Sequence, residues 1–304
     1  MGISIGTRGS KLALWQTNHV KSLLEAQGHH VEVRIYKTTG DIQQDRPLHL
    51  IGEKGLFTKA LDEGLLNGEV DIAVHSSKDI PTRLPEALEI CAFLEREDPR
   101  DVLLALGPEV DLDNHSREFT VGTSSLRRIA FVGHYAPQFK AKIVRGNVDT
   151  RIQKMEDGQY DALILAYAGV KRMGRMDRVV RKLNVNTFTP AVGQGAIGVM
   201  VRSDNPVAAA VRETLNHQET EWAVRAERSF LRKLEGGCHA PIFALGTVTL
   251  DTLSLMGGVA AEDGSVLYRE KVRGPVTSAA ELGINLAEIV LNQGARQILN
   301  GQKS

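Results

Sequence analysis

Apolar strand patterns alternate with amphipathic helix patterns along the first part of the chain. Val31, Val33 and Ile35 alternate with polar residues, which is the period-2 pattern of a half-buried strand. The hydrophobic pattern of the first 95 residues predicts strands at 3–7, 31–37, 71–75 and 88–94, and helices at 10–26 and 57–66. Between Thr38 and Gly55 the pattern fails. A stretch of this length without regular structure is typical of a functional segment, so we predict a mobile loop or lid there.

A second series of strands and helices follows the charged segment Glu95–Asp101, which we interpret as a crossing between domains. The series comprises predicted strands at 120–122, 142–144 and 162–166, helices that begin at 124 and 147, and a short helix that contains residues 170–173. Alternation of strands with helices is typical of parallel sheets built from α/β units. The residues from Ile197 to Val201 form one more predicted strand.

The pattern changes after His217. A helix at 220–234 precedes strands at 245–250, 253–259 and 266–272, and a helix at 278–291 follows them. The sequence Glu262-Asp263-Gly264-Ser265 is typical of the turn of a hairpin. This part of the chain is predicted to form a small α+β domain.

Composition narrows the class of protein. A chain of 304 residues exceeds the usual size of one domain, so we expect two or three. No apolar run approaches the roughly 20 residues of a membrane helix, and the N-terminus shows no signal-peptide pattern. Two cysteines do not make a disulfide framework, which suits a reducing cytoplasm. The formal net charge is zero, so no overall field favours nucleic acid, and any anion site must be local.

Cationic side chains recur where predicted strands end. They are Arg8, Lys78, Arg127, Arg128, Arg145, Arg151, Lys171 and Arg172, and Thr123, Ser124 and Asn147 are candidate helix N-caps among them. Open parallel sheets bind ligands beyond the carboxyl ends of their strands, and helix N-termini attract anions. The recurrence points to a substrate that bears several carboxylates. The alternative for any single arginine is a solvated basic face or a structural ion pair.

Two residues suggest reaction chemistry. Asp79 is the acid of these strand-end motifs; it could stabilise a developing cation, which we favour, or deliver a proton, and the alternative is a helix cap or salt bridge. Cys238 follows Gly236-Gly237, a tight turn where a thiol could attack an electrophilic carbon; the alternative is a buried small hydrophobe. We assign that structural role to Cys91, which lies in an apolar run.

Two common site motifs do not apply. Gly193 to Gly198 match GxGxxG, but no strand precedes the motif and the residues after Ala196 look like a strand, so the dinucleotide interpretation fails. The nine histidines show neither HxxxH nor CxxC spacing, so we expect no metal site, and we interpret His75 as structural.

Motifs along the whole chain resemble those of the porphobilinogen deaminase family, also called hydroxymethylbilane synthases. In the family's order they are TRGSKLALWQ, KGLFTKAL, DIAVHSSKDIPT, EREDPRD, VGTSSLRR, VRGNVDTR, LAYAGVKRMG, PAVGQGAIG, ERSFLRKLEGGCHAPI and NQGARQIL. The resemblance implies an α/β protein with two periplasmic-binding-protein-like α/β domains and a small C-terminal α+β domain. The implied domains are 1–95 with 196–216, then 96–195, then 217–304, which carries the cofactor cysteine.

The resemblance also implies a reaction. The family's enzymes join four porphobilinogen molecules head to tail, release ammonia at each step and yield linear hydroxymethylbilane for tetrapyrrole (haem) biosynthesis. They build a dipyrromethane cofactor that is bound by a thioether to the cysteine matching Cys238, and Asp79 matches the catalytic aspartate. The implied cofactor contacts are Asp41, Ser76, Lys78, Ser124, Arg127 and Arg128, and the implied substrate contacts are Arg8, Lys54, Arg145, Arg151, Arg172 and Gln194. A cytoplasmic monomer that passes its product to the next tetrapyrrole enzyme, without nucleic-acid or membrane partners, is expected.

Some residues depart from the family's pattern. Leu50 stands where some relatives carry a second loop lysine, Glu53 interrupts a common Gly-Gly, and Ala240 and Phe243 change the packing after the cysteine. These departures affect local geometry and leave the thiol in place. Two alternatives from other classes remain: an exported solute-binding protein would need a signal sequence, and a ligand-sensing regulator would need a DNA-binding module. We see neither.

Overall fold

The structure is a computed structural model that describes residues 2–37, 58–113, 117–234 and 241–301. Its internal contacts divide the chain into two units. The first unit comprises Met1–Glu97 and Gly195–Glu221, and the second comprises Asp98–Gln194 and Trp222–Ser304. Each unit is described by itself.

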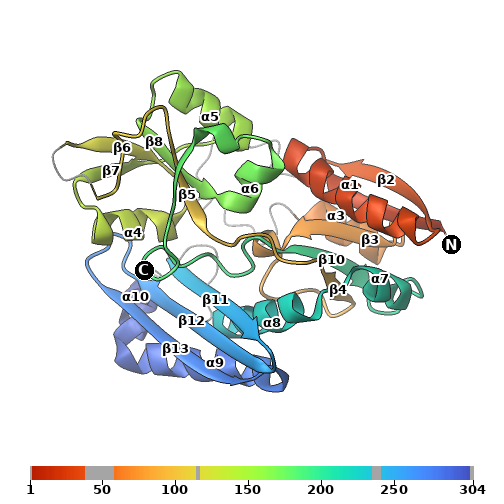
Figure 1. Ribbon diagram of the computed structural model, residues 1–304. Coiled ribbons are helices and arrows are strands. Elements are labelled where there is room, and N and C mark those ends of the chain that lie inside the picture. Colours follow the sequence, from red (N-terminus) through yellow and green to blue (C-terminus); the bar gives the residue numbers. More distant parts are fainter. Residues whose placement is uncertain (1, 38–57, 114–116, 235–240, 302–304) are drawn as a thin grey trace. The chain divides into compact units, whose positions relative to one another are not determined.

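The first unit is built on a five-stranded mixed sheet (Figure 1). Its strands, in the order β2-β1-β3-β10-β4, are His30–Tyr36, Gly2–Arg8, Ile72–Ser76, Ile197–Arg202 and Leu88–Phe93. Strand β1 pairs in parallel with β2 and β3, whereas β10 is antiparallel to both β3 and β4. The returning strand β10 therefore completes a sheet whose other strands all precede residue 94.

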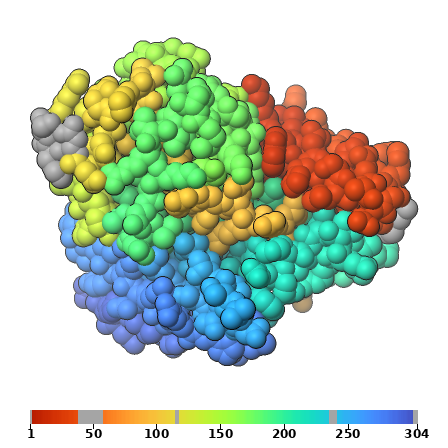
Figure 2. All heavy atoms as spheres, in the orientation of Figure 1, coloured from red at the N-terminus to blue at the C-terminus, as the bar shows by residue number. Residues whose placement is uncertain are grey.

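Helices cover both faces of this sheet. They are α1 (Lys11–Ala26), α3 (Lys59–Leu66) and α7 (Ala208–Leu215), and a 3-10 turn, η2 (Ser77–Asp79), follows β3. Helix α1 begins where it does because the side chain of Ser10 accepts a hydrogen bond from the backbone N–H of Ala13. Its Val20 and Leu24 pack against the sheet core, while its outer side belongs to the red surface in Figure 2.

The second unit contains another five-stranded sheet with a similar plan. Its strands, in the order β7-β6-β8-β5-β9, are Phe139–Lys142, Phe119–Gly122, Ala162–Ala166, Asp101–Ala105 and Val179–Lys182. Strand β6 is parallel to β7 and β8, and β5 is antiparallel to β8 and β9. The helical elements of this part are α4 (Leu126–Tyr135), α5 (Val148–Glu156), α6 (Tyr167–Arg172) and the 3-10 turn η3 (Met176–Arg178).

The C-terminal part of the second unit is a three-stranded antiparallel sheet with helices (Figure 1). The sheet consists of β11 (Ile242–Thr249), β12 (Thr252–Ala260) and β13 (Leu267–Pro275). Around it lie α8 (Gln218–Lys233), which starts in the first unit, η4 (Val276–Ser278), α9 (Ala279–Val290), the π-turn η5 (Leu291–Ala295) and α10 (Arg296–Gly301). Phe230, Leu255 and Leu286 are fully buried in the core between the sheet and its helices.

The fold class is confirmed, with corrections to individual elements. The expectation of parallel sheets is wrong for one strand of each sheet, because β10 and β5 follow the segments that link the two units and run opposite to the other strands. Strands β5 and β9 were not predicted. The strand expected at 142–144 lies at Phe139–Lys142, where the apolar residues alternate with lysines. Helix α4 begins after Ser125, so Thr123 and Ser124 are not its N-caps.

The domain boundaries at 96–195 and 217–304 stay a prediction. In the structure both segments belong to the second unit, and they share a core. The ring of Phe131 in α4 lies 4.9 Å from that of Phe243 in β11, between ring centroids. The predicted loop at 38–55 lies outside the described residues.

Candidate functional site

The carboxyl ends of two adjacent parallel strands form a hollow in the first unit. Arg8 is the last residue of β1 and Ser76 the last residue of β3, and these strands pair directly. Asp79 ends the turn η2 that follows β3. The hollow has a volume of about 60 Å³ and is lined by Arg8, Ser10, Leu12, Ala13, Gln16, Val74, His75, Ser76 and Asp79. The prediction that strand-end residues converge is therefore confirmed for Arg8, Ser76 and Asp79.

Asp79 presents an available carboxylate to this hollow. Its side chain is exposed, and it makes no hydrogen bond or ion pair with any described residue. The helix-cap and salt-bridge alternatives considered for Asp79 therefore have no support among these residues. Lys78, beside it in the same turn, is also exposed. A cation and an anion, Arg8 and Asp79, thus line one small hollow.

Gln16 is a residue of the hollow that the sequence analysis did not single out. It lies on α1 with only 2% of its surface exposed, and its Nε2 donates a hydrogen bond of 2.9 Å to Ser76 Oγ. A buried polar side chain needs such a partner, so the bond fixes the Ser76 hydroxyl against the helix. The sequence did contain a signal for this residue: Gln16 is a polar residue on the side of the predicted helix that the hydrophobic pattern places in the core.

His75 forms part of the wall and stays neutral. It is 5% exposed, and its Nε2 has no hydrogen-bond partner among the described residues. Burial, together with the positive charge of Arg8, lowers the pKa of His75 to about 4. A neutral imidazole therefore borders the Arg8 guanidinium at neutral pH.

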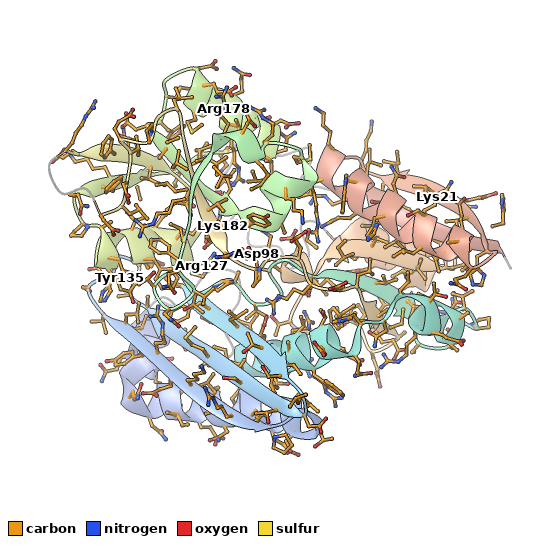
Figure 3. All side chains as sticks on the ribbon, in the orientation of Figure 1. Lys21, Asp98, Arg127, Tyr135, Arg178 and Lys182 are labelled. Atoms are coloured by element: carbon orange, nitrogen blue, oxygen red, sulfur yellow. The ribbon has the colours of Figure 1, made fainter. Side chains whose placement is uncertain are left out.

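The second unit brings Arg127, Arg128 and Gln194 together around a carboxylate that the sequence analysis did not identify. Asp101, the first residue of β5, is fully buried, and Arg127 and Arg128 are 4% and 6% exposed. The nitrogen–oxygen distances in the two ion pairs are 2.7 Å for Arg127 and 2.8 Å for Arg128. Figure 3 labels Arg127 where α4 approaches β5.

The charges of this cluster stabilise one another. Burial alone raises the pKa of Asp101, but the two adjacent guanidiniums outweigh burial and hold that pKa well below its usual range. The structural ion-pair alternative left open for these arginines thus describes part of their role. The signal for Asp101 was its place in EREDPRD, at the start of a strand that the pattern did not predict.

The remaining predicted contacts in the second unit are partly exposed. Ser124 lies in the segment between β6 and α4, Arg145 follows β7, Arg151 lies in α5 and Arg172 ends α6. The three arginines are half-buried. Arg151 Nε donates to the backbone carbonyl of Gly146 at 2.7 Å. Their predicted contacts with a substrate stay predictions.

Three predicted site residues, Asp41, Lys54 and Cys238, lie outside the described residues. The structural role assigned to Cys91 is confirmed: it is buried, and burial raises the pKa of its thiol to about 12. Within the described residues, no group of three or more His, Cys, Asp or Glu side chains is arranged to hold a metal ion. None of the helices in that part of the chain has the length and apolar character needed to cross a membrane.

Comparisons with known proteins identify the family. The model of "Porphobilinogen deaminase, dipyromethane cofactor binding domain" matches residues 3–210, and that of "Porphobilinogen deaminase, C-terminal domain" matches residues 222–292. The porphobilinogen deaminase of Geobacter sulfurreducens is 48% identical over 302 residues, which cover 98% of this chain and 93% of that protein. That of Geobacter metallireducens is 47% identical over 300 residues, with the same coverage of 98% and 93%.

Among solved structures, the chain is similar to the BvgS VFT2 domain of Bordetella pertussis, with a TM-score of 0.42 and 14% identity. That similarity covers 70% of this chain and 85% of the other. The two family models together match most of the chain, and relatives close to half identical span nearly all of it. The chain belongs to the porphobilinogen deaminase family.

Proposed function

We propose that this chain is a hydroxymethylbilane synthase that joins porphobilinogen molecules head to tail with release of ammonia, and that Asp79 is its catalytic carboxylate. The observation that carries the proposal is the hollow lined by both Arg8 and Asp79, whose exposed carboxylate makes no hydrogen bond or ion pair with a described residue. Porphobilinogen combines carboxylates with an aminomethyl group, so a site with one cation and one anion matches both ends of its chemistry.

Asp79 would act on the positive charge that develops as ammonia leaves. A unit charge 4 Å from a carboxylate is stabilised by about 1 kcal/mol in water and by about 4 kcal/mol near a protein surface. The upper figure corresponds to roughly a thousandfold in rate. Delivery of a proton to the leaving amine is the second role that the same position allows.

Arg8 and Ser76 would position the substrate. Arg8 offers a planar fork of N–H donors that suits a carboxylate. The hydroxyl of Ser76 is held by Gln16, so it can be directed into the hollow without rotating freely. A volume of about 60 Å³ is several times the space that one water needs, which is room for a single substituent of a pyrrole ring.

The residues present fit a dipyrromethane cofactor, whose pyrroles carry carboxylates. In the second unit, the buried Arg127 has an Nε–H without a partner among the described residues, which is a donor that an acidic ligand would satisfy. Arg128, Gln194, Ser124 and Lys78 are the further proposed contacts, with Asp41 and Lys54, and Cys238 would hold the group as a thioether. When bound, the dipyrromethane supplies the primer to which the pyrrole units are joined.

The covalent cofactor is tested by intact-protein mass spectrometry. We expect an added mass of two linked pyrrole units on the wild-type chain, and none when Cys238→Ser is expressed. An unmodified wild-type chain that still turns over porphobilinogen would contradict this part of the proposal.

The role of Asp79 is tested by Asp79→Asn, with Glu86→Gln as the control. Glu86 is an exposed acid in the segment that follows and does not line the hollow. We expect Asp79→Asn to lower kcat by about 100- to 1000-fold while cofactor loading and unfolding stay as in the wild type, and Glu86→Gln to change none of these. Equal activity of the two variants would exclude the proposed role.

We further propose that the enzyme works as a cytoplasmic monomer and passes hydroxymethylbilane to the next enzyme of tetrapyrrole synthesis. The two cysteines, one of them buried and the other proposed to carry the cofactor, are consistent with a reducing compartment. Sedimentation at working concentrations tests the monomer.

A further inference from the structure

The guanidinium of Arg269 lies among aromatic rings in the second unit. Arg269 is a half-buried residue of β13, and its Cζ lies 5.8, 5.9 and 5.3 Å from the ring centroids of Phe131, Tyr135 and Phe243. Gly258 pairs with Arg269 across the two strands, and a Cβ on that glycine would lie 2.6 Å from the Phe243 ring. The absent side chain therefore leaves room for a ring that the guanidinium contacts.

The same guanidinium also binds the backbone of the segment between β9 and β10. Its Nη1 donates to the carbonyl of Asn186 and, at 3.0 Å, to the hydroxyl of Tyr135. Its Nη2 donates to the carbonyl of Thr187 at 2.9 Å. A long apolar side chain could pack against the same rings, so the feature that arginine adds is the planar fork of donors that holds the two carbonyls.

The groups that Arg269 holds lead to Arg127 by two routes. Thr189 lies just after the held carbonyls in the sequence, is fully buried, and accepts from Arg127 Nη1 at 2.8 Å through its own carbonyl. Its hydroxyl donates to the carbonyl of Val185 at 2.8 Å, which ties this segment into a turn. The second route is the buried ring of Phe131, whose centroid lies 5.7 Å from Arg127 Cζ and 5.8 Å from Arg269 Cζ. Both routes end at one guanidinium.

The hairpin turn before β13 packs against α4 as well. The ring Nδ1 of His134 forms a hydrogen bond of 2.8 Å with the carbonyl oxygen of Gly264. A Cβ on Gly133 would lie 2.4 Å from the carbonyl oxygen of Asp263, and one on Gly264, whose φ is +76°, would lie as close to the backbone of α4. Because the turn and the helix touch backbone to backbone, the strand that carries Arg269 has little freedom to shift along α4.

We propose that Arg269, a residue of the C-terminal sheet, is a positioning residue for Arg127 and acts through Phe131 and the Thr189 carbonyl. A guanidinium on a flexible stem loses rotational freedom when it binds a ligand, and that loss weakens binding. Arg269 removes this freedom before the ligand arrives. The cofactor contact of Arg127 rests on the proposed function, whereas the ordering of Arg127 is a property of the chain alone.

The ordering of Arg127 is measured by the heteronuclear NOE of arginine Nε–H groups in 15N-labelled protein, which reports fast side-chain motion. The Arg127 signal is assigned by its loss in Arg127→Lys. We expect a rigid Nε–H in the wild type and in the cofactor-free Cys238→Ser chain, and a mobile one when Arg269→Met is added to either. The control is His134→Ala, which removes the neighbouring bond to the hairpin turn and should leave the signal rigid. A rigid signal in Arg269→Met, or an equally mobile one in the control, overturns the proposal.

The consequence for the cofactor is measured by the gain in urea midpoint of the cofactor-loaded chain over the Cys238→Ser chain, with loading checked by intact mass. A purely structural role of Arg269 would lower both midpoints alike and leave the gain unchanged. We expect Arg269→Met to remove most of the gain, and to remove nothing further when Arg127→Lys is already present. A folded Arg269→Met chain without added mass is the extreme form of this loss. An unchanged gain overturns the proposal.

Arg269→Lys tests the fork of donors and replaces Arg269→Met if that variant does not fold. Lysine keeps a positive charge beside the rings, but it is a compact point charge that does not reproduce the planar fork. We expect a urea midpoint closer to the wild type than that of Arg269→Met, together with a mobile Arg127 signal. A rigid Arg127 signal in Arg269→Lys overturns the proposal. A wild-type chain without added mass would refute the proposed cofactor separately, and the NMR comparison in the Cys238→Ser chain would still decide the role of Arg269.

Discussion

Acid weakens the first unit through His75. The imidazole is buried beside Arg8, and its pKa is lowered from 6.5 to about 4. Between pH 6.5 and pH 4 the imidazole is therefore protonated in the unfolded chain and neutral in the folded chain. Because the unfolded chain binds the additional proton, the free energy of unfolding falls as the pH drops from 6.5 toward 4. Above pH 7 the histidine is neutral in both states and contributes no pH dependence.

The size of the effect follows from the two pKa values. Linkage over this interval gives a loss of about 2.5 kcal/mol between pH 7.5 and pH 4.5. The glutamine of His75→Gln binds no proton in that range. The variant is therefore expected to lose about 2.5 kcal/mol less stability than the wild type between the two pH values. Asp62, whose pKa burial raises to about 6, acts in the opposite direction. Because it is present in both proteins, its effect cancels in the difference.

The assay is urea unfolding at pH 7.5 and pH 4.5, followed by the fluorescence of Trp15 in a Trp222→Phe background, because Trp15 lies in the first unit. His30→Gln removes an exposed histidine of the same unit and is expected to follow the wild type. If His75→Gln loses as much stability as the wild type between the two pH values, the assignment of a buried neutral imidazole is refuted.

Three further changes probe other parts of the structure. Glu227→Gln should lower the free energy of unfolding, measured in urea melts, by about 1–3 kcal/mol. The two oxygens of the buried carboxylate accept hydrogen bonds from the backbone N–H groups of Gly193 and Gly246 at 2.7 and 2.8 Å. An amide has one oxygen, so it can replace only one of these two acceptors. Cys91 should resist alkylation in the native protein at pH 8 and react only in urea, since its thiol is buried with a raised pKa; modification of native protein at that residue would contradict this. Asn147→Ala should cost about 1 kcal/mol through the lost cap of α5, with no such loss for Asn147→Asp as the control.

Much of the fold was predictable because local signals and tertiary structure agree. The alternation of Val31, Val33 and Ile35 and the cap at Ser10 reflect forces that act within a few residues. The direction of β5 and β10 was not predictable in the same way. Both are apolar runs that fit either direction, and the choice depends on where the chain crosses between units, which no local pattern records.

The positions of the site residues at strand ends were predictable, but the residues that contact them were less so. Arg8, Ser76 and Asp79 lie at strand ends as expected, because parallel strands bring their carboxyl ends to one edge. The ion pairs of Asp101 were not predicted, since an acid that contacts residues about 26 positions away leaves no periodic trace. Gln16 was missed for a related reason: its partner Ser76 is 60 residues distant.

The place of β10 between β3 and β4 has a consequence during synthesis on the ribosome. Roughly 100 residues separate the end of β4 from the start of β10, and at 5–20 residues per second they take about 5–20 s to emerge. Throughout that interval β3 and β4 lack the strand that joins them, so their open edges can pair with other chains. During this interval, protection of the nascent chain by a chaperone matters most. The interval ends when β10 has been synthesised through residue 202 and can pair with β3 and β4.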